Sequence, residues 1–171
     1  MNELKKLIRN IPDFPKKGIL FRDITTVLND KKAFRSAIDE LAGLIADKKI
    51  DYIVAAESRG FIFGAALAYK LNCGFVPVRK PGKLPAKTFR HTYALEYGED
   101  SLEIHQDAFK AGAKILILDD LLAIGGTADA MVNLVKKLKG EITAILFLIE
   151  LTDLKGRDKL KDCPVYSLIK Y

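Results

Sequence analysis

The segment from Ile115 to Ala130, ILILDDLLAIGGTADA, joins an apolar strand pattern, two acidic residues and a glycine-rich turn. Its first residues, ILIL, are typical of a strand that is covered on both faces of a parallel sheet. Asp119 and Asp120 follow directly, and the two glycines let the backbone fold back before Thr127 opens a helix. Unpaired N–H groups at a helix start bind anions, while adjacent carboxylates attract hydroxyl groups or a cation. The segment therefore predicts a phosphate-binding turn beside a pair of hydroxyl acceptors.

The same residues have a plainer interpretation, in which Asp120 starts an ordinary loop and Thr127 caps a helix. Gly-Gly-Thr taken alone fits that interpretation well. The two acidic residues fit it poorly, because adjacent carboxylates repel each other and lose solvation at the end of an apolar strand. Ligands of parallel sheets bind at the carboxyl ends of the strands, so we expect a ligand-binding site here.

Strands and helices alternate on both sides of this segment. Apolar residues at helical spacing indicate helices, and short apolar runs between turn residues indicate strands. Alternating elements of this kind predict an α/β fold, a mostly parallel sheet flanked by helices. The expected elements are a helix over about 31–47, a strand over 52–55, a turn over 57–60, a helix ending at 71, a strand over 74–78, a hairpin formed by 93–97 and 101–105, a strand over 114–118, a helix over 127–138 and a strand over 142–149.

The chain has 171 residues, with 28 basic and 22 acidic side chains and 49% hydrophobic residues. This composition is that of a globular protein, and the length predicts one domain over residues 1–171. Apolar stretches fall far short of the ~20 residues that cross a bilayer, and residues 1–10 lack the apolar core of a signal peptide. Two cysteines without a paired spacing predict neither a disulfide framework nor a zinc site. These features favour a cytoplasmic protein without a membrane partner.

The stretch from Arg79 to Arg90, RKPGKLPAKTFR, holds five basic residues and no acidic one, in a chain whose net charge is +6. A nucleic-acid-binding surface usually spreads its basic residues over a longer face, so a single basic loop suits a compact polyanion better. Considered alone, the stretch is equally compatible with a solvated basic loop. The sequence contains neither a P-loop nor a G-x-G-x-x-G motif. We therefore expect small-molecule ligands and no nucleic-acid partner.

Motifs elsewhere in the chain accompany the segment Asp119 to Thr127. They are Ile11–Pro15, Gly18–Ile24, Glu57–Phe61, Arg79–Pro85, Leu95–Gly98 and Glu150–Thr152. Together they resemble the adenine phosphoribosyltransferases, which belong to the type I phosphoribosyltransferases. The segment Asp119 to Thr127 is similar to the signature for phosphoribosyl diphosphate (PRPP), although Ile124 stands where most relatives have Thr. That signature indicates only the wider family, and the segments around Phe21 and Glu96 point to adenine.

The resemblance implies that adenine and PRPP react to give AMP and pyrophosphate, with Mg²⁺ held mainly by PRPP or pyrophosphate. It also implies the type I fold with a small N-terminal hood and a flexible lid hairpin, a homodimer, and a cis peptide bond between Glu57 and Ser58. The implied PRPP- and AMP-binding residues are Arg59, Arg79, Lys80, Lys83, Tyr97, Asp119, Asp120, Ala123, Ile124, Gly125, Gly126 and Thr127.

Within this set, the resemblance assigns the 5′-phosphate to the turn 123–127 and the ribose hydroxyls to the two aspartates. Arg59, Lys80 and Lys83 suit pyrophosphate, and Arg79 would serve the partner subunit of the dimer. A surface ion pair is the alternative for Arg59, although its position in a turn after a strand favours the site.

For the base, the resemblance assigns adenine to Leu20, Phe21 and Arg22, with the Phe21 ring stacking on the purine. By sequence alone Phe21 is simply a core residue. Glu96, with Tyr97 beside it on the lid hairpin, is the implied catalytic residue, which transfers a proton or forms a hydrogen bond at the imidazole ring of adenine when the lid closes.

Two other functions remain as alternatives. A non-enzymatic nucleotide sensor would keep the PRPP segment, but it would normally need a DNA-binding module for which this chain has no room. A transferase for hypoxanthine or guanine is the nearest enzymatic alternative, and only the resemblance around Phe21 and Glu96 argues against it. Incubating the protein with PRPP, Mg²⁺ and each purine base in turn would distinguish the three.

Overall fold

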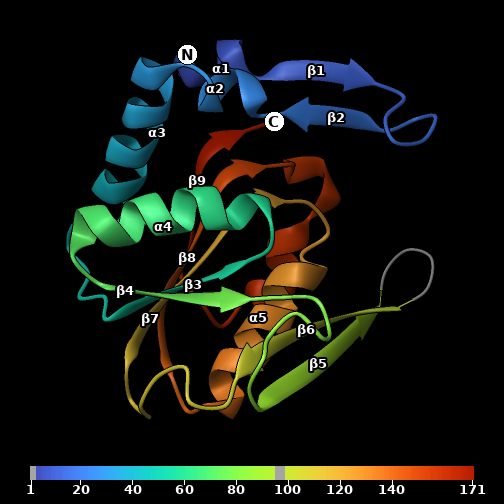
Figure 1. The fold of residues 1–171 in the computed structure, drawn as a ribbon. Helices are drawn as coiled ribbons and strands as arrows, with labels where there is room; N and C mark the ends of the chain where they lie inside the picture. Colours follow the sequence, from blue (N-terminus) through green and yellow to red (C-terminus); the bar gives the residue numbers. More distant parts are fainter. Residues whose placement is uncertain (1–2, 95–98) are drawn as a thin grey trace. The chain divides into compact units, whose positions relative to one another are not determined.

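The computed structural model describes residues 3–94 and 99–171. The chain divides into two compact units, Met1–Glu40 and Leu41–Tyr171. Figure 1 labels the α-helices and strands along the chain. The single domain expected over residues 1–171 stays a prediction.

The first unit contains a two-stranded antiparallel sheet and short helices. Arg9 in the first of its strands faces Asp23 in the second, and their side chains form an ion pair at 2.8 Å. The elements are α1 (Glu3–Leu7), β1 (Arg9–Pro12), β2 (Leu20–Asp23), α2 (Thr25–Leu28) and α3 (Lys31–Gly43), the last of which ends beyond residue 40.

Helix α3 is shorter than the expected range 31–47. It starts after Asp30, whose carboxylate accepts the backbone N–H groups of Lys32 and Ala33 at 2.8 and 3.0 Å. It ends at Gly43, which is a poor helix former, and tighter turns such as Ile45 N–H to Ala42 C=O replace the helix. The apolar spacing continues past Gly43, and this continuation misled the sequence interpretation.

The second unit is built on a five-stranded parallel sheet with the strand order β4-β3-β7-β8-β9. This confirms the α/β fold with a parallel sheet flanked by helices. Its elements are β3 (Tyr52–Ala56), α4 (Arg59–Leu71), β4 (Gly74–Val78), β5 (Thr88–Ala94), β6 (Glu99–His105), β7 (Lys114–Leu122), α5 (Gly126–Lys137), β8 (Glu141–Glu150), the 3₁₀ turns η1 (Thr152–Leu154) and η2 (Gly156–Leu160), and β9 (Val165–Lys170).

Helices α4 and α5 cover opposite faces of this sheet. Val54 of β3 lies in the same buried cluster as Met131 of α5, whereas the neighbouring Ala55 points the other way, toward Gly64 of α4. Successive side chains of a strand point to opposite faces, so both faces of β3 are buried. This double cover explains why the strands are apolar throughout rather than alternating.

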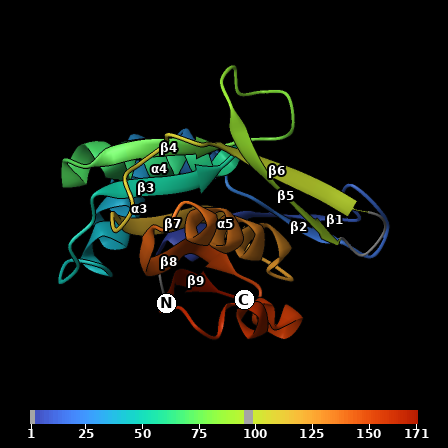
Figure 2. The same cartoon turned by 90° about the horizontal axis from the view of Figure 1, so that it is seen from below.

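In the second unit, two boundaries differ clearly from the sequence prediction, and one strand was not expected. Strand β7 continues to Leu122, because the residues after the apolar run still pair with β8, for example Asp119 with Phe147. The hairpin begins at Thr88, inside the basic stretch, where Thr88 pairs with His105, and Figure 2 shows β5 and β6 side by side. Strand β9 was not expected, since its short sequence carries a weak pattern until β8 pairs with it.

No helix in the described ranges 3–94 and 99–171 is long and apolar enough to span a membrane.

Candidate functional site

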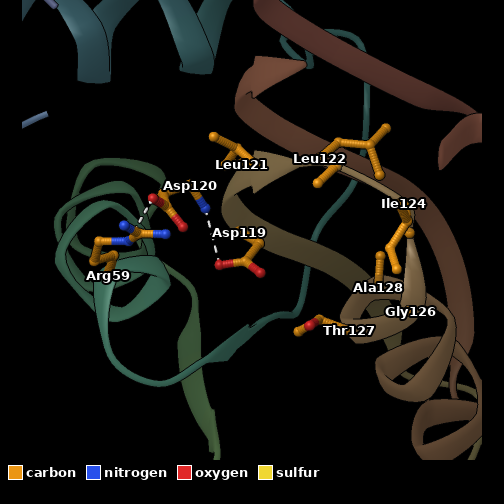
Figure 3. A pocket seen from close by; sticks show the side chains of 11 residues that line it. Arg59, Asp119, Asp120, Leu121, Leu122, Ile124, Gly126, Thr127 and Ala128 are labelled. Atoms are coloured by element: carbon orange, nitrogen blue, oxygen red, sulfur yellow. Dashed lines mark hydrogen bonds and ion pairs between the residues drawn. The ribbon is translucent and has the colours of Figure 1, made fainter. Parts of the chain in front are cut away.

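A pocket of about 220 Å³ lies at the carboxyl end of β7, where α4 and α5 begin. Figure 3 shows Arg59, Asp119, Asp120 and Thr127 around it. Its lining residues come from the first turn of α4, the end of β7 and the start of α5, namely Arg59, Asp119, Asp120, Leu121, Leu122, Ala123, Ile124, Gly125, Gly126, Thr127 and Ala128. The tertiary structure thus brings one cation, two carboxylates and a helix start into one cavity.

The pKa values of the two aspartates in the pocket are both raised. Burial and the neighbouring Asp120 carboxylate hold the pKa of Asp119 well above its usual value. Burial also raises the pKa of Asp120, whose side chain is 6% exposed, while the Arg59 guanidinium opposes that rise. Arg59 Nε lies 2.7 Å from Asp120 Oδ2, yet that oxygen has no well-directed hydrogen bond among the described residues. The pair therefore has spare acceptor capacity for ligand hydroxyl groups or a cation.

The first turn of α4 packs directly on the end of β7. A Cβ atom on Gly60 would lie 2.9 Å from Asp119 Oδ1 and 3.4 Å from the Leu118 carbonyl oxygen. Glycine at this position therefore lets Arg59 approach the aspartates closely. The Glu57–Ser58 peptide bond just before it is cis, as the resemblance implied.

The turn from Ala123 to Gly126 leads into α5 as expected from the sequence. Gly125 has φ +81°, a backbone conformation that favours glycine, and it is the N-cap of α5. The N-terminal end of α5 lines the pocket. The backbone N–H groups of its first turn point out of this end, where the helix dipole is positive. Ile124 is 40% exposed, so it does not pack fully beneath the turn.

The basic loop after β4 is held by an acidic residue that sequence reasoning missed. Glu57 accepts hydrogen bonds from Arg79 Nε and from the Lys80 backbone N–H, both at 2.7 Å. Burial alone would raise the pKa of Glu57, but these two bonds lower it overall. The sequence does contain a signal for Glu57, because this residue directly follows β3 and so lies at the same edge of the sheet as Asp119.

The expected pyrophosphate ligands beyond Arg59 are not gathered at the pocket. Lys80 forms an ion pair with Asp100 of β6, and Arg79 also bonds the Lys83 carbonyl oxygen at 3.3 Å. In the described part of the chain, the residues lining the pocket do not include Arg79, Lys80 or Lys83. Their role toward a ligand stays a prediction.

The β5–β6 hairpin contacts the start of α5 through a tyrosine hydroxyl. The Tyr93 hydroxyl of β5 lies 3.4 Å from Thr127 Oγ1 and 3.3 Å from Asp100 Oδ2. Burial raises the pKa of Tyr93, so its hydroxyl stays a neutral donor. Sequence reasoning missed this contact, because Tyr93 and Thr127 are far apart along the chain.

The residues expected to bind adenine lie in the first unit. Phe21 of β2 makes an edge-to-face contact with Phe14 at 5.1 Å, and Arg22 Nη1 donates a hydrogen bond to Asn10 Oδ1. Leu20 is 46% exposed. Phe21 is half-buried, which agrees with neither a core residue nor a free surface residue. Glu96 and Tyr97 lie outside the described residues.

Comparisons with known proteins agree on one family. Residues 25–170 match the model of the phosphoribosyl transferase domain. The chain is 62% identical to an adenine phosphoribosyltransferase of Brachyspira hyodysenteriae, over 99% of both chains. The crystal structure of adenine phosphoribosyltransferase from Thermoanaerobacter pseudethanolicus is 58% identical, with a TM-score of 0.97 over 99% of this chain and 98% of that one.

A third relative is the Saccharomyces cerevisiae adenine phosphoribosyltransferase, whose crystal structure contains an imino-altritol bisphosphate and adenine. It is 45% identical, with a TM-score of 0.92 over 97% of this chain and 96% of that one. The relatives match nearly the whole length of the chain, and they agree with a pocket that combines the start of a helix, suited to bind phosphate, with two carboxylates. The chain therefore belongs to the adenine phosphoribosyltransferases, the type I phosphoribosyltransferases that use PRPP for the pentosyl transfer from which AMP is made from adenine in purine salvage.

Proposed function

We propose that the pocket at the end of β7 holds the phosphoribosyl group of PRPP while adenine replaces pyrophosphate. The proposal rests on the observation that one cavity is lined by Arg59, Asp119, Asp120 and the turn 123–127. The 5′-phosphate lies against the backbone N–H groups of the turn and the hydroxyl of Thr127. The ribose hydroxyls donate hydrogen bonds to the two carboxylates, which adds hydrogen bonds at Asp120 Oδ2 to its ion pair with Arg59.

This arrangement suits the charges that develop during the reaction. Breaking the bond between C1′ and pyrophosphate builds positive charge on the sugar and negative charge on the leaving group. Asp119 and Asp120 under the ribose stabilise the first, and cations near pyrophosphate stabilise the second. Arg59 is already beside the pocket, whereas Lys80 must leave Asp100 to reach it. Exclusion of water matters, since water competes with adenine for the sugar cation.

The carboxylate pair also fits a divalent cation. Carboxylate oxygens are hard donors that suit Mg²⁺, and Asp120 Oδ2 has no hydrogen bond among the described residues; most of the ligands of the ion come from phosphate, ribose and water oxygens. When bound, Mg²⁺ neutralises charge on the pyrophosphate group. Among the residues described, no cluster of three or more His, Cys, Asp or Glu side chains forms a dedicated metal site. The protein's own contribution is therefore to orient the sugar through Asp119 and Asp120.

We assign adenine to the β2 segment. Phe21 offers an aromatic face, and the main chain of Leu20 and Arg22 offers hydrogen bonds that distinguish purines. The yeast relative, which is 45% identical to this chain, was crystallised with adenine, and this supports adenine as the base. From the resemblance alone, we propose that Glu96 moves the proton at the imidazole ring of adenine and that Tyr97 binds PRPP; both lie outside the described residues.

We further propose a homodimer in the cytoplasm. Helix α4 exposes Ile62 (40%) and Tyr69 (92%), apolar groups on one side of the helix that a second copy would cover. Arg79 of each copy then serves the partner's site. Cys73 and Cys163 are free thiols, which suits a reducing compartment.

A product assay tests the proposed reaction. The protein is mixed with PRPP, Mg²⁺ and adenine, hypoxanthine or guanine, and the nucleotides are separated by chromatography. We expect AMP from adenine and little or no nucleotide from the other bases. IMP or GMP as the main product would contradict the assignment of adenine as the base. The absence of any nucleotide would contradict the proposed reaction.

A further inference from the structure

The turn from Ala123 to Gly126 rests on a backbone segment that follows β8. A Cβ atom on Gly156, the first residue of η2, would overlap the carbonyl oxygen of Ala123 and lie 2.9 Å from a methyl group of Leu122. In the other direction, a Cβ atom on Gly125 would lie 2.5 Å from the Gly156 carbonyl oxygen. Two facing glycines thus let two stretches of backbone touch without side chains between them.

The segment that carries Gly156 is itself held firmly. Arg157 Nε and Nη2 donate to the two carboxylate oxygens of Glu150 at 2.5 and 2.7 Å. Arg157 Nη1 donates to the Val165 carbonyl oxygen at 2.8 Å, and Nη2 donates to Ser167 Oγ at 3.2 Å. The guanidinium therefore ties η2 to the end of β8 and to β9 at once.

The Glu150 carboxylate is a well-defined anchor for this tie. Its side chain is 6% exposed, and the hydrogen bond from Arg157 holds its pKa below the usual value, so it remains charged. Glu150 pairs with Leu122 across the β7–β8 ladder, and the Leu151 N–H bonds the Leu122 carbonyl oxygen at 2.9 Å. The last residue of β7 and the segment beneath the turn are therefore fixed to the same strand.

We propose that Gly156 and the Glu150–Arg157 ion pair are positioning residues for the 5′-phosphate of PRPP. They do not touch the ligand. They fix the position of the backbone from Ala123 to Gly126, and therefore the direction of the N–H groups that bind the phosphate. The inference rests on the proposed placement of the 5′-phosphate on this turn.

Gly156→Ala tests the contact most directly. The added methyl group must push the Ala123 carbonyl away, and a displacement of about 1 Å in a binding group can cost about 10²-fold. We expect the Kd of AMP and of ribose 5-phosphate, measured by calorimetry, to rise by about 10- to 100-fold, and the KM for PRPP to rise more than kcat falls. The affinity for pyrophosphate stays unchanged, because pyrophosphate lies on the other side of the ribose.

Three further variants separate positioning from general destabilisation. Arg157→Met removes all four hydrogen bonds, and Arg157→Lys keeps the charge, so the lysine variant should recover part of the AMP affinity. Leu160→Ala removes a buried side chain from the same 3₁₀ turn. We expect it to lower Tm without changing the Kd of AMP.

Thr127→Val distinguishes failure of this inference from failure of the proposed phosphate site. If it weakens ribose 5-phosphate while Gly156→Ala does not, the phosphate site stands and the positioning role is wrong. If Thr127→Val leaves ribose 5-phosphate binding unchanged, the phosphate placement itself is wrong. If Leu160→Ala weakens AMP as strongly as Gly156→Ala, the effect is one of stability and the positioning role is wrong.

Discussion

Replacement of Arg59 by methionine should make nucleotide binding depend on pH in a new range. Arg59 is the cation that opposes the rise in the pKa of the buried Asp120. Without it, the pKa of the aspartate pair rises further, and a protonated carboxyl group is a poorer acceptor for ribose hydroxyls. AMP affinity is full above this pKa and is lost as the pH falls through it. The loss should therefore begin at a higher pH in the variant.

The separation of the two charges gives the size of this shift. Arg59 Nε lies 2.7 Å from Asp120 Oδ2, but the Arg59 side chain is 41% exposed to solvent. A close pair of charges contributes about 1 kcal/mol in water and about 4 kcal/mol near a protein surface, and the exposure of Arg59 favours about 1 to 2 kcal/mol. Since one pKa unit corresponds to about 1.4 kcal/mol, we expect the midpoint to rise by roughly one pH unit.

Calorimetry with AMP is the suitable assay, because AMP lacks the pyrophosphate that Arg59 is proposed to bind. The phosphate of AMP titrates near pH 6 with either protein, so the difference between the two curves reports on the aspartates. Lys80→Met is the matched control, since Lys80 pairs with Asp100 and not with Asp120. It should raise the KM for PRPP and leave the AMP curve unmoved. Equal midpoints for the original chain and the Arg59 variant would refute the reasoning.

Three more predictions concern the site. Glu96→Gln should keep AMP binding and lower kcat by about 10²- to 10⁴-fold, as expected for loss of a general acid or base, and an unchanged kcat with a raised KM would show a binding role only. Ile124→Thr should tighten AMP and PRPP binding several-fold without changing base preference, because the exposed isoleucine is replaced by a hydroxyl donor near the phosphate; equal dissociation constants by calorimetry would show that the hydroxyl is irrelevant. Asp119→Asn should abolish most activity and yet raise the free energy of unfolding, because it removes a charge whose pKa is raised by burial. Since the folded pKa lies above the unfolded one, this gain should be full above the folded pKa, shrink as the pH falls below it, and be gone below the unfolded pKa, which urea unfolding at several pH values can measure.

The strand and helix pattern could be predicted because it depends on neighbours along the chain. The ILIL run before Asp119 needed only its composition to indicate a strand buried on both faces. The Gly-Gly-Thr after it needed only local backbone preferences to indicate a turn into a helix. Where the prediction was wrong, as at the end of α3, two local preferences disagreed: the apolar spacing continues beyond Gly43, but glycine is a poor helix former and the helix ends there.

The sequence by itself determined the α/β class and the placement of Asp119, Asp120 and the turn 123–127 at a strand end, since each follows from residues a few positions apart. The family resemblance added the adenine assignment. Only the tertiary structure decided that Gly60 lies against Asp119, that Glu57 holds the basic loop, and that Gly156 supports the turn. These contacts join segments far apart along the chain, and pairing across a sheet edge depends on strand order and register, which no local pattern encodes.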